Sequence, residues 1–209
     1  MAQRMLLFGG TFDPVHHGHL IVARAVAEAR HFERVTLVPA GRRPGKDTPE
    51  ADAENRLAML RLAVEADPQF DLCPMEIERP GPSYTVDTLT ALRAQHGADA
   101  ELHWLIGADM LAELPTWHRA REVVDLARMV VVARPPMAEG LDDVLESLRR
   151  EWGDECAHRL AEGVTPAPLI DISSTLIRSR VAAGKSIRYL VPPRVGAYIE
   201  NHHLYRADS

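Results

Sequence analysis

The sequence predicts an α/β fold in which helices flank one doubly wound, mainly parallel sheet. Short apolar runs alternate along the 209 residues with longer segments whose apolar residues recur at helical spacing. Several of these runs are apolar on both faces, which is typical of central strands in a parallel sheet. Crossovers between parallel strands are right-handed, so the helices are expected on both faces of the sheet.

Six apolar runs are expected to form the strands. Aliphatic and β-branched residues dominate them, and such residues favour a buried strand. In chain order the predicted strands are RMLLF (4–8), RVTLVP (34–39), FDLCPME (70–76), ELHWLIG (101–107), RMVVVAR (128–134) and APLIDI (167–172).

The segments between these strands carry apolar residues three and four positions apart and therefore predict helices. They cover residues 19–31, 53–66, 85–95, 119–126, 141–152 and 174–183. A final helix is expected after Pro192 and Pro193, with Val195, Tyr198 and Ile199 on one packing face.

A chain of this length fits a single domain, and we expect residues 1–209 to form one, with a small C-terminal helical segment from about 172 to 209. Residues 41–52, GRRPGKDTPEAD, interrupt the alternation because they are polar and rich in turn-forming residues. They predict a long loop after the second strand. Such loops are either binding lids or plain surface segments, and the sequence leaves both interpretations open.

Composition excludes several classes of protein. Hydrophobic residues make up 46% and charged residues 26%, close to the globular average, which argues against disorder and fibrous repeats. A net charge of -6 provides no general attraction to nucleic acid, although cationic groups in a cleft still attract small anions. Cys73 and Cys156 match no metal or redox spacing. With no signal peptide or membrane span expected, we predict a cytoplasmic protein without a membrane partner, and leave a homo-oligomer open.

The stretch GGTFDPVHHGHL, residues 9–20, follows the first predicted strand. Ligands of open parallel sheets bind beyond the carboxyl ends of the strands, where this stretch lies. Its glycines, including Gly18, are expected to let a ligand approach the backbone, and Thr11 adds a hydroxyl. His16 and His19 share one side of the following helix start and are placed to donate to an anion there. The stretch therefore predicts a phosphate site.

Two other interpretations of this stretch remain open. In the first, the stretch is a plain glycine turn with surface histidines. In the second, its histidines bind a metal ion. A zinc site normally needs three or four ligands, and HHGH lacks both the H-E-x-x-H pattern and a cysteine pair. The G-x-G-x-x-G and Walker phosphate patterns are also absent.

A second polar motif, ISSTLIRSR, follows the last predicted strand. Ser173 stands at an N-cap position, Ser174 opens the helix, and Arg178 lies on the same helix face one turn later. Alone, this pattern is common in helix starts. Together with the histidine motif it predicts a phosphate clamp with one side from each end of the chain.

The two motifs resemble those of the T/HxGH nucleotidyltransferase superfamily, namely H-x-G-H after the first strand and I-S-S-T-x-[IV]-R late in the chain. Within it, the chain is similar to bacterial nicotinate-nucleotide adenylyltransferases. ERPGPSYTVDTL, LIGADML, LPTWHRA and VVVARP carry this closer match, which runs from Leu6 to Tyr205. The resemblance implies a Rossmann-like enzyme of NAD biosynthesis that transfers AMP from ATP to nicotinate mononucleotide, releasing pyrophosphate and forming deamido-NAD.

The resemblance also implies roles for individual residues. His16, His19 and Arg178 are the expected catalytic residues, and the C-terminal segment belongs to the ATP site. ATP contacts are expected from Gly9, Gly10, Thr11, Phe12, His16, His19, Gly107, Asp109, Ile172, Ser173, Ser174 and Arg178. Nicotinate mononucleotide contacts are expected from Lys46, Thr85, Asp109, Trp117, His118 and Arg134. Mg²⁺ is expected to arrive with ATP rather than on protein ligands.

Some of these positions depart from the family pattern or have an ordinary structural explanation. Gly45 replaces a frequent histidine, Arg43 a frequent proline, and His118 a frequent tyrosine. Trp117 on sequence alone also fits core packing, and Asp109 fits a helix cap. The rival functions are phosphopantetheine adenylyltransferase, which lacks the SYTVDT and PTWH stretches, a non-catalytic nucleotide-binding protein and a metal-binding protein.

Overall fold

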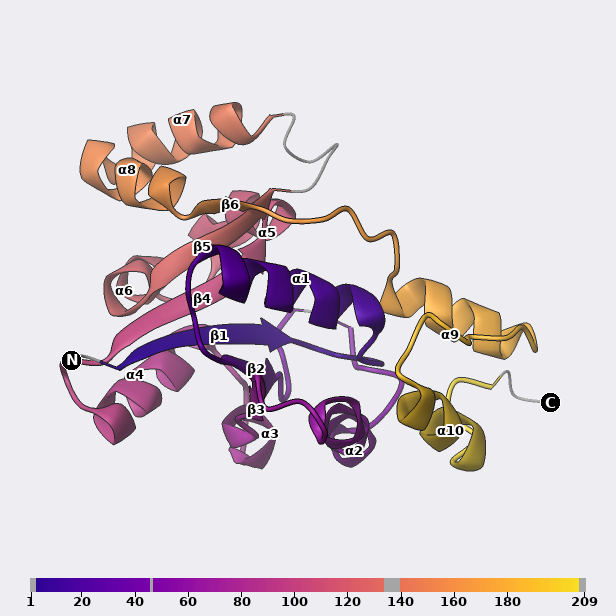
Figure 1. Ribbon diagram of the computed structural model, residues 1–209. Helices are drawn as coiled ribbons and strands as arrows, with labels where there is room; N and C mark the ends of the chain where they lie inside the picture. The colour runs from indigo at the N-terminus through magenta and orange to yellow at the C-terminus, as the bar shows by residue number, and fades with distance from the viewer. Residues whose placement is uncertain (1–2, 46, 134–139, 207–209) are drawn as a thin grey trace.

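The computed structural model describes residues 3–45, 47–133 and 140–206 and contains one six-stranded sheet (Figure 1). All neighbouring strands pair in parallel, in the order β3-β2-β1-β4-β5-β6. The predicted fold class is therefore confirmed. The strands are β1 (Arg4–Gly10), β2 (Val35–Pro39), β3 (Phe70–Leu72), β4 (Glu101–Gly107), β5 (Arg128–Ala133) and β6 (Val164–Pro166).

Helices cover both faces of this sheet. They are α1 (His17–Ala29), α2 (Ala53–Val64), α3 (Met75–Glu78), α4 (Thr85–His96), α5 (Ala108–Glu113), the 3₁₀ helix η1 (Leu114–Thr116), α6 (Ala120–Leu126), α7 (Leu141–Trp152), α8 (Asp154–Glu162), α9 (Ser174–Ala182) and α10 (Pro193–Asn201).

Two hydrophobic clusters pack against opposite faces of the sheet. Consecutive strand residues point to opposite faces, so Leu6 belongs to one cluster and Leu7 to the other. The first cluster is completed by α1, α2, α9 and α10, and the second by α4 to α8. The expected packing face of α10 is confirmed, since Val195 and Ile199 are buried and Tyr198 packs partly buried against the same cluster.

Two predicted strands differ from the observed ones, the third at its carboxyl end and the sixth along its whole length. The third ends at Leu72 rather than at residue 76, because Pro74 has no N–H to continue the ladder and α3 starts at Met75. The sixth lies at Val164–Pro166 rather than at 167–172. Pro166 and Pro168 cannot donate ladder hydrogen bonds, so this edge strand ends early and the chain runs on to α9 without regular structure.

The short elements α3, α5 and η1 and the longer helix α8 were not predicted. Cys156, Ala157 and Leu160 form the buried face of α8. Because α8 begins two residues after α7 ends, its apolar pattern was not recognised as a separate helix. Gly153, with φ +89°, separates the two helices, a conformation that glycine adopts without strain. None of the described helices is long and apolar enough to span a membrane.

Helices α9 and α10 lie together at one end of the molecule, beside the start of α1, which follows the carboxyl end of β1 (Figure 1). Successive strands are added on one side of β1 up to β3, and on its other side from β4 to β6. Open α/β sheets bind ligands at such a change of direction, which here lies between β1 and β4. The fold therefore brings the first and last motifs of the chain to the same end of the sheet.

Candidate active site

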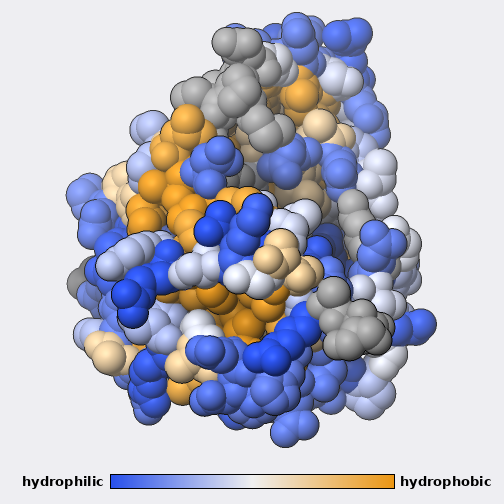
Figure 2. Space-filling model, turned by 90° about the vertical axis from the view of Figure 1, so that its right-hand side faces the viewer, coloured by the Kyte–Doolittle hydropathy of each residue, from blue (hydrophilic) through white to orange (hydrophobic). Residues whose placement is uncertain are grey.

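A cavity of about 870 Å³ lies at this reversal point. Twelve of the predicted site residues line it: Gly9, Gly10, His16, His19, Thr85, Gly107, Asp109, Trp117, His118, Ile172, Ser173 and Ser174. Hydrophobic residues gather in the middle of this end of the molecule and hydrophilic ones surround them (Figure 2). A cavity with an apolar wall and convergent polar groups is typical of a small-molecule site.

His16 and His19 form the N-terminal cap of α1. The His19 N–H donates to His16 Nδ1 and the His16 N–H donates to His19 Nδ1, both at 3.3 Å. The two rings stack with centroids 3.6 Å apart. Helix starts leave backbone N–H groups without helical partners, so this reciprocal cap explains why two histidines stand three residues apart.

The cap also decides which nitrogen of each ring carries a proton. Because Nδ1 of both His16 and His19 accepts a hydrogen bond, a neutral imidazole carries its proton on Nε2. His16 is 5% exposed and His19 is partly buried, and both line the cavity. The pair therefore presents Nε2–H donors in a fixed geometry.

The expectation that glycines in the first motif make room for a ligand needs correction at two positions. A Cβ on Gly9 would overlap the ring of Trp104. A Cβ on Gly18 would lie 2.9 Å from His16 Nδ1 and 3.2 Å from the Ile172 carbonyl oxygen. Gly9 thus lets an aromatic ring of β4 pack on β1, and Gly18 lets the segment before α9 approach the histidine cap.

The two predicted motifs meet directly. Ser174 Oγ donates to the Pro14 carbonyl at 2.9 Å, across 160 residues of sequence. Ser173 caps α9 by accepting from the Leu176 N–H at 3.1 Å, as predicted. One cavity is thereby lined by imidazoles from one end of the chain and by a serine-capped helix start from the other.

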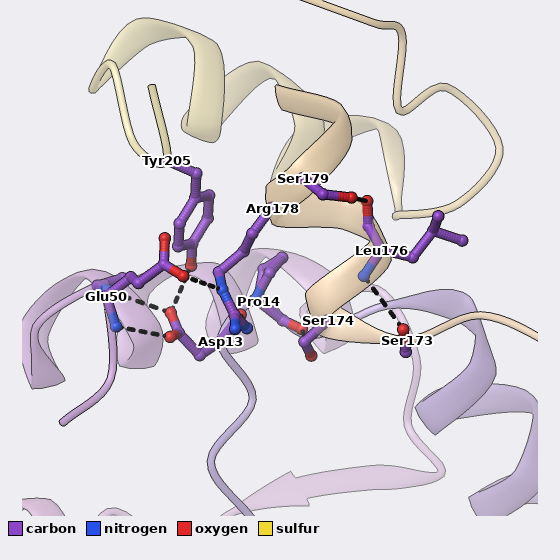
Figure 3. Close-up of polar contacts among 10 residues, drawn as sticks. Asp13, Pro14, Glu50, Ser173, Ser174, Leu176, Arg178, Ser179 and Tyr205 are labelled. Atoms are coloured by element: carbon purple, nitrogen blue, oxygen red, sulfur yellow. Dashed lines mark hydrogen bonds and ion pairs between the residues drawn. The ribbon is translucent and has the colours of Figure 1, made fainter. Parts of the chain in front are cut away.

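Three predicted ATP contacts are not among the residues that line the cavity. The buried Phe12 ring packs edge-on against His19, with centroids 5.0 Å apart. The Thr11 carbonyl accepts from Arg56 Nη1 at 2.7 Å. Arg178 donates from Nη1 to the Asp13 carbonyl at 2.9 Å, so its guanidinium is directed toward the first motif (Figure 3).

The other half of the cavity is formed by α4, α5 and η1. Thr85 is the first residue of α4, whose N-cap Tyr84 makes no side-chain hydrogen bond to the helix. Trp117 is half-buried, packs against the second hydrophobic cluster and also lines the cavity. Asp109 lines the cavity from the uncapped start of α5. The exposed His118 ring lies against Tyr84, with centroids 4.3 Å apart.

Sequence reasoning missed Glu76, which is 6% exposed and lines the cavity. Its Oε1 accepts from Thr88 Oγ1 at 2.8 Å, and Arg79 Nη2 donates to the same hydroxyl at 2.9 Å. Burial raises the pKa of the Glu76 carboxyl, against the opposing effects of the Thr88 hydrogen bond and of the Arg79 and Arg43 charges. A carboxylate at the end of the mainly apolar run FDLCPME was the signal available in the sequence.

Residues 41–52 contribute to the cavity through Arg43, Pro44 and Gly45. Arg43 Nη1 donates to Thr11 Oγ1 at 3.3 Å, so this arginine adds positive charge that sequence reasoning did not assign to the site. These contacts favour a binding role over a plain surface loop. The predicted phosphate contacts Lys46 and Arg134 lie outside the described residues.

Comparison with known proteins identifies close relatives. The chain matches the family described as cytidylyltransferase-like over residues 7–180. A protein of Thermomicrobium roseum is 44% identical over 98% of this chain and 92% of its own length. One of Pseudomonas aeruginosa is 43% identical over 99% of both chains. Both carry the name "Probable nicotinate-nucleotide adenylyltransferase".

Solved structures share the fold at lower sequence identity. The nicotinic acid mononucleotide adenylyltransferase of Plasmodium falciparum, complexed with NaAD, has a TM-score of 0.73 at 16% identity over 97% of each chain. The same enzyme complexed with APC has a TM-score of 0.71. These structures share the fold of the chain over 97% of its length.

Proposed function

The chain belongs to the nicotinate-nucleotide adenylyltransferase family, and we propose that it transfers AMP from ATP to nicotinate mononucleotide. The products are deamido-NAD and pyrophosphate, which places the enzyme in NAD biosynthesis. The convergence of the histidine cap and the serine-capped start of α9 around one cavity carries this proposal. A triphosphate needs cationic and N–H donors from two sides, and these two elements supply them.

The attacking 5′-phosphate is already an anion, so the reaction needs no protein nucleophile. Catalysis then consists of aligning an oxygen of this 5′-phosphate with the α-phosphorus and the departing pyrophosphate, and of stabilising the negative charge on the α-phosphate oxygens in the transition state. The Nε2–H groups of His16 and His19 face the α-phosphate in this proposal. Their shared cap holds both donors in place before ATP binds, which avoids reorganisation during the reaction.

The β- and γ-phosphates bind at the start of α9. Ser173 and Ser174 line the cavity there, and the positive end of the helix dipole favours an anion. Arg178 reaches the phosphates from one turn behind them. It keeps its hydrogen bond to the Asp13 carbonyl and exchanges the Glu50 carboxylate, its partner at 2.6 Å, for phosphate oxygens.

Mg²⁺ fits this site as a companion of ATP. The described residues contain no group of three or more His, Cys, Asp or Glu side chains that could hold a metal ion. Mg²⁺ keeps much of its water and is commonly bound through substrate phosphates. When bound, it neutralises charge on the departing pyrophosphate.

Nicotinate mononucleotide binds in the half formed by α4, α5 and η1. The nicotinate carboxylate accepts from the Thr85 N–H at the uncapped start of α4 and from the His118 N–H. The Trp117 ring stacks on the pyridinium, and Asp109 accepts from a ribose hydroxyl. Lys46 and Arg134 are proposed to contact its phosphate. Both cysteines are free, in keeping with a cytoplasmic enzyme.

A pyrophosphate-release assay with ATP, Mg²⁺ and a set of acceptors tests the function. Nicotinate mononucleotide should be adenylylated, and its amide analogue at least ~100-fold less efficiently, because an amide leaves N–H donors unpaired. Phosphopantetheine is the control acceptor and should release no pyrophosphate. Equal turnover of acid and amide would contradict the carboxylate contacts.

A further inference from the structure

The Asp13 carboxylate is the centre of a buried polar cluster (Figure 3). Asp13 is 4% exposed, and its Oδ1 accepts from the Tyr205 hydroxyl at 2.7 Å and from the Ala51 N–H at 3.1 Å. Its Oδ2 accepts from the Glu50 N–H at 2.8 Å. A carboxylate removed from water requires such partners, so the cluster holds together as a unit.

Arg178 is held by two residues of this same cluster. Its Nη1 donates to the Asp13 carbonyl at 2.9 Å and its Nε to Glu50 Oε1 at 2.6 Å. The Glu50 backbone is in turn fixed by the Asp13 carboxylate. The direction of the guanidinium therefore depends on how firmly Asp13 and residues 50–51 are placed.

Tyr205 is the member of the cluster that comes from the end of the chain. It is 8% exposed and follows α10, and its ring belongs to the same hydrophobic cluster as α1 and α2. Burial and the neighbouring Asp13 carboxylate both raise the pKa of its hydroxyl, so it stays protonated and donates. Its hydrogen bond spans 192 residues and ties the C-terminal tail to the loop that precedes the histidine cap.

We propose that Tyr205 is a positioning residue for ATP, which acts through Asp13 on the guanidinium of Arg178. This rests on the proposed role of Arg178 in binding the β- and γ-phosphates. The tyrosine touches no substrate. It fixes Asp13, and Asp13 offers its carbonyl to Arg178 and orders Glu50, so the tail sets how well the arginine meets the triphosphate.

Tyr205→Phe tests this, because it removes one oxygen and keeps the packed ring. The matched control is Tyr198→Phe, which removes a hydroxyl from α10 that donates to Asn55 Oδ1 at 2.9 Å and contacts neither Asp13 nor Arg178. We expect Tyr205→Phe to raise the KM for ATP by ~5- to 10-fold, in line with loss of a charge-assisted hydrogen bond. The KM for nicotinate mononucleotide should stay within ~2-fold. Tyr198→Phe should change neither constant by more than ~2-fold.

Arg178→Ala and the double variant separate the possible outcomes. If Tyr205 acts through Arg178, Tyr205→Phe should have no further effect on the KM for ATP in the Arg178→Ala background. Equal effects in both backgrounds, a Tyr205→Phe enzyme indistinguishable from Tyr198→Phe, or a parallel rise of both KM values would overturn the positioning role. An unchanged KM for ATP in Arg178→Ala alone would instead overturn the proposed role of the arginine.

Discussion

The two halves of the cavity begin their helices in different ways. Where ATP is proposed to bind, α1 and α9 are both capped by side chains, from His16 and Ser173. Where nicotinate mononucleotide is proposed to bind, α4 and α5 start at Tyr84 and Gly107 without any side-chain cap. An uncapped start leaves backbone N–H groups that need an acceptor, and a substrate oxygen can supply one.

The difference indicates that the two substrates are recognised by different chemistry. The ATP half offers side-chain donors fixed by hydrogen bonds over long sequence distances, such as that from Ser174 to Pro14. The acceptor half offers backbone donors and an aromatic face at Trp117. The buried Glu76 accepts a hydrogen bond from Thr88 of α4 in this half. Changes in the first half should therefore affect ATP binding and the chemical step, and changes in the second should affect acceptor binding.

The largest effect is expected for His19→Ala. It removes one preorganised donor and half of the α1 cap, and should lower kcat by at least ~100-fold, as loss of one such donor does in other enzymes. Steady-state pyrophosphate release measures it. His17→Ala is the control, because His17 lies between the two histidines and does not line the cavity. A folded His19→Ala enzyme with near-normal kcat would remove this residue from the mechanism.

A smaller effect is expected for Trp117→Ala. Loss of the stacking face should raise the KM for nicotinate mononucleotide by ~10-fold, on the order of a cation–π contact in a partly desolvated site. The KM for ATP should change by less than ~2-fold, because Trp117 lies in the acceptor half. Trp117→Phe should recover part of the affinity. A rise in the KM for ATP of similar size would show that the two halves are not independent.

The smallest effect is expected for Glu76→Gln, as a pH-dependent change in stability. Burial raises the folded-state pKa of Glu76, so above the usual carboxyl pKa of 4.5 the folded state keeps a proton that the unfolded state releases. The contribution of Glu76 to the stability of the wild-type protein is therefore greatest below pH 4.5. It is lost as the pH rises through the folded-state pKa of Glu76. Glutamine does not titrate and still accepts from Thr88.

The Tm of Glu76→Gln relative to wild type should consequently rise between pH 4 and pH 8, by a few degrees in a chain of this size. Thermal unfolding followed by circular dichroism at several pH values measures the difference. Parallel Tm curves for the two proteins would show that Glu76 has the same pKa in the folded and unfolded states.

Much of the fold and half of the site follow from local sequence. The apolar runs predicted four strands close to their observed bounds, because a buried parallel strand must be apolar on both faces. The two phosphate motifs were found because histidines and serines at helix starts have a local physical purpose. The missed α8 depends instead on the break in the chain at Gly153. The misplaced sixth strand depends on Pro166 and Pro168, which end the edge strand early.

The sequence alone determined the parallel sheet, the residues of the two motifs and the kind of ligand they suit, since these depend on periodicity and on neighbours within one helical turn. Only the tertiary structure decided that Gly9 makes room for Trp104, that Glu76 supports the acceptor half, and that Tyr205 meets Asp13. Hydrogen bonds between residues 12 to 192 positions apart depend on how the elements pack, and no local pattern encodes that packing.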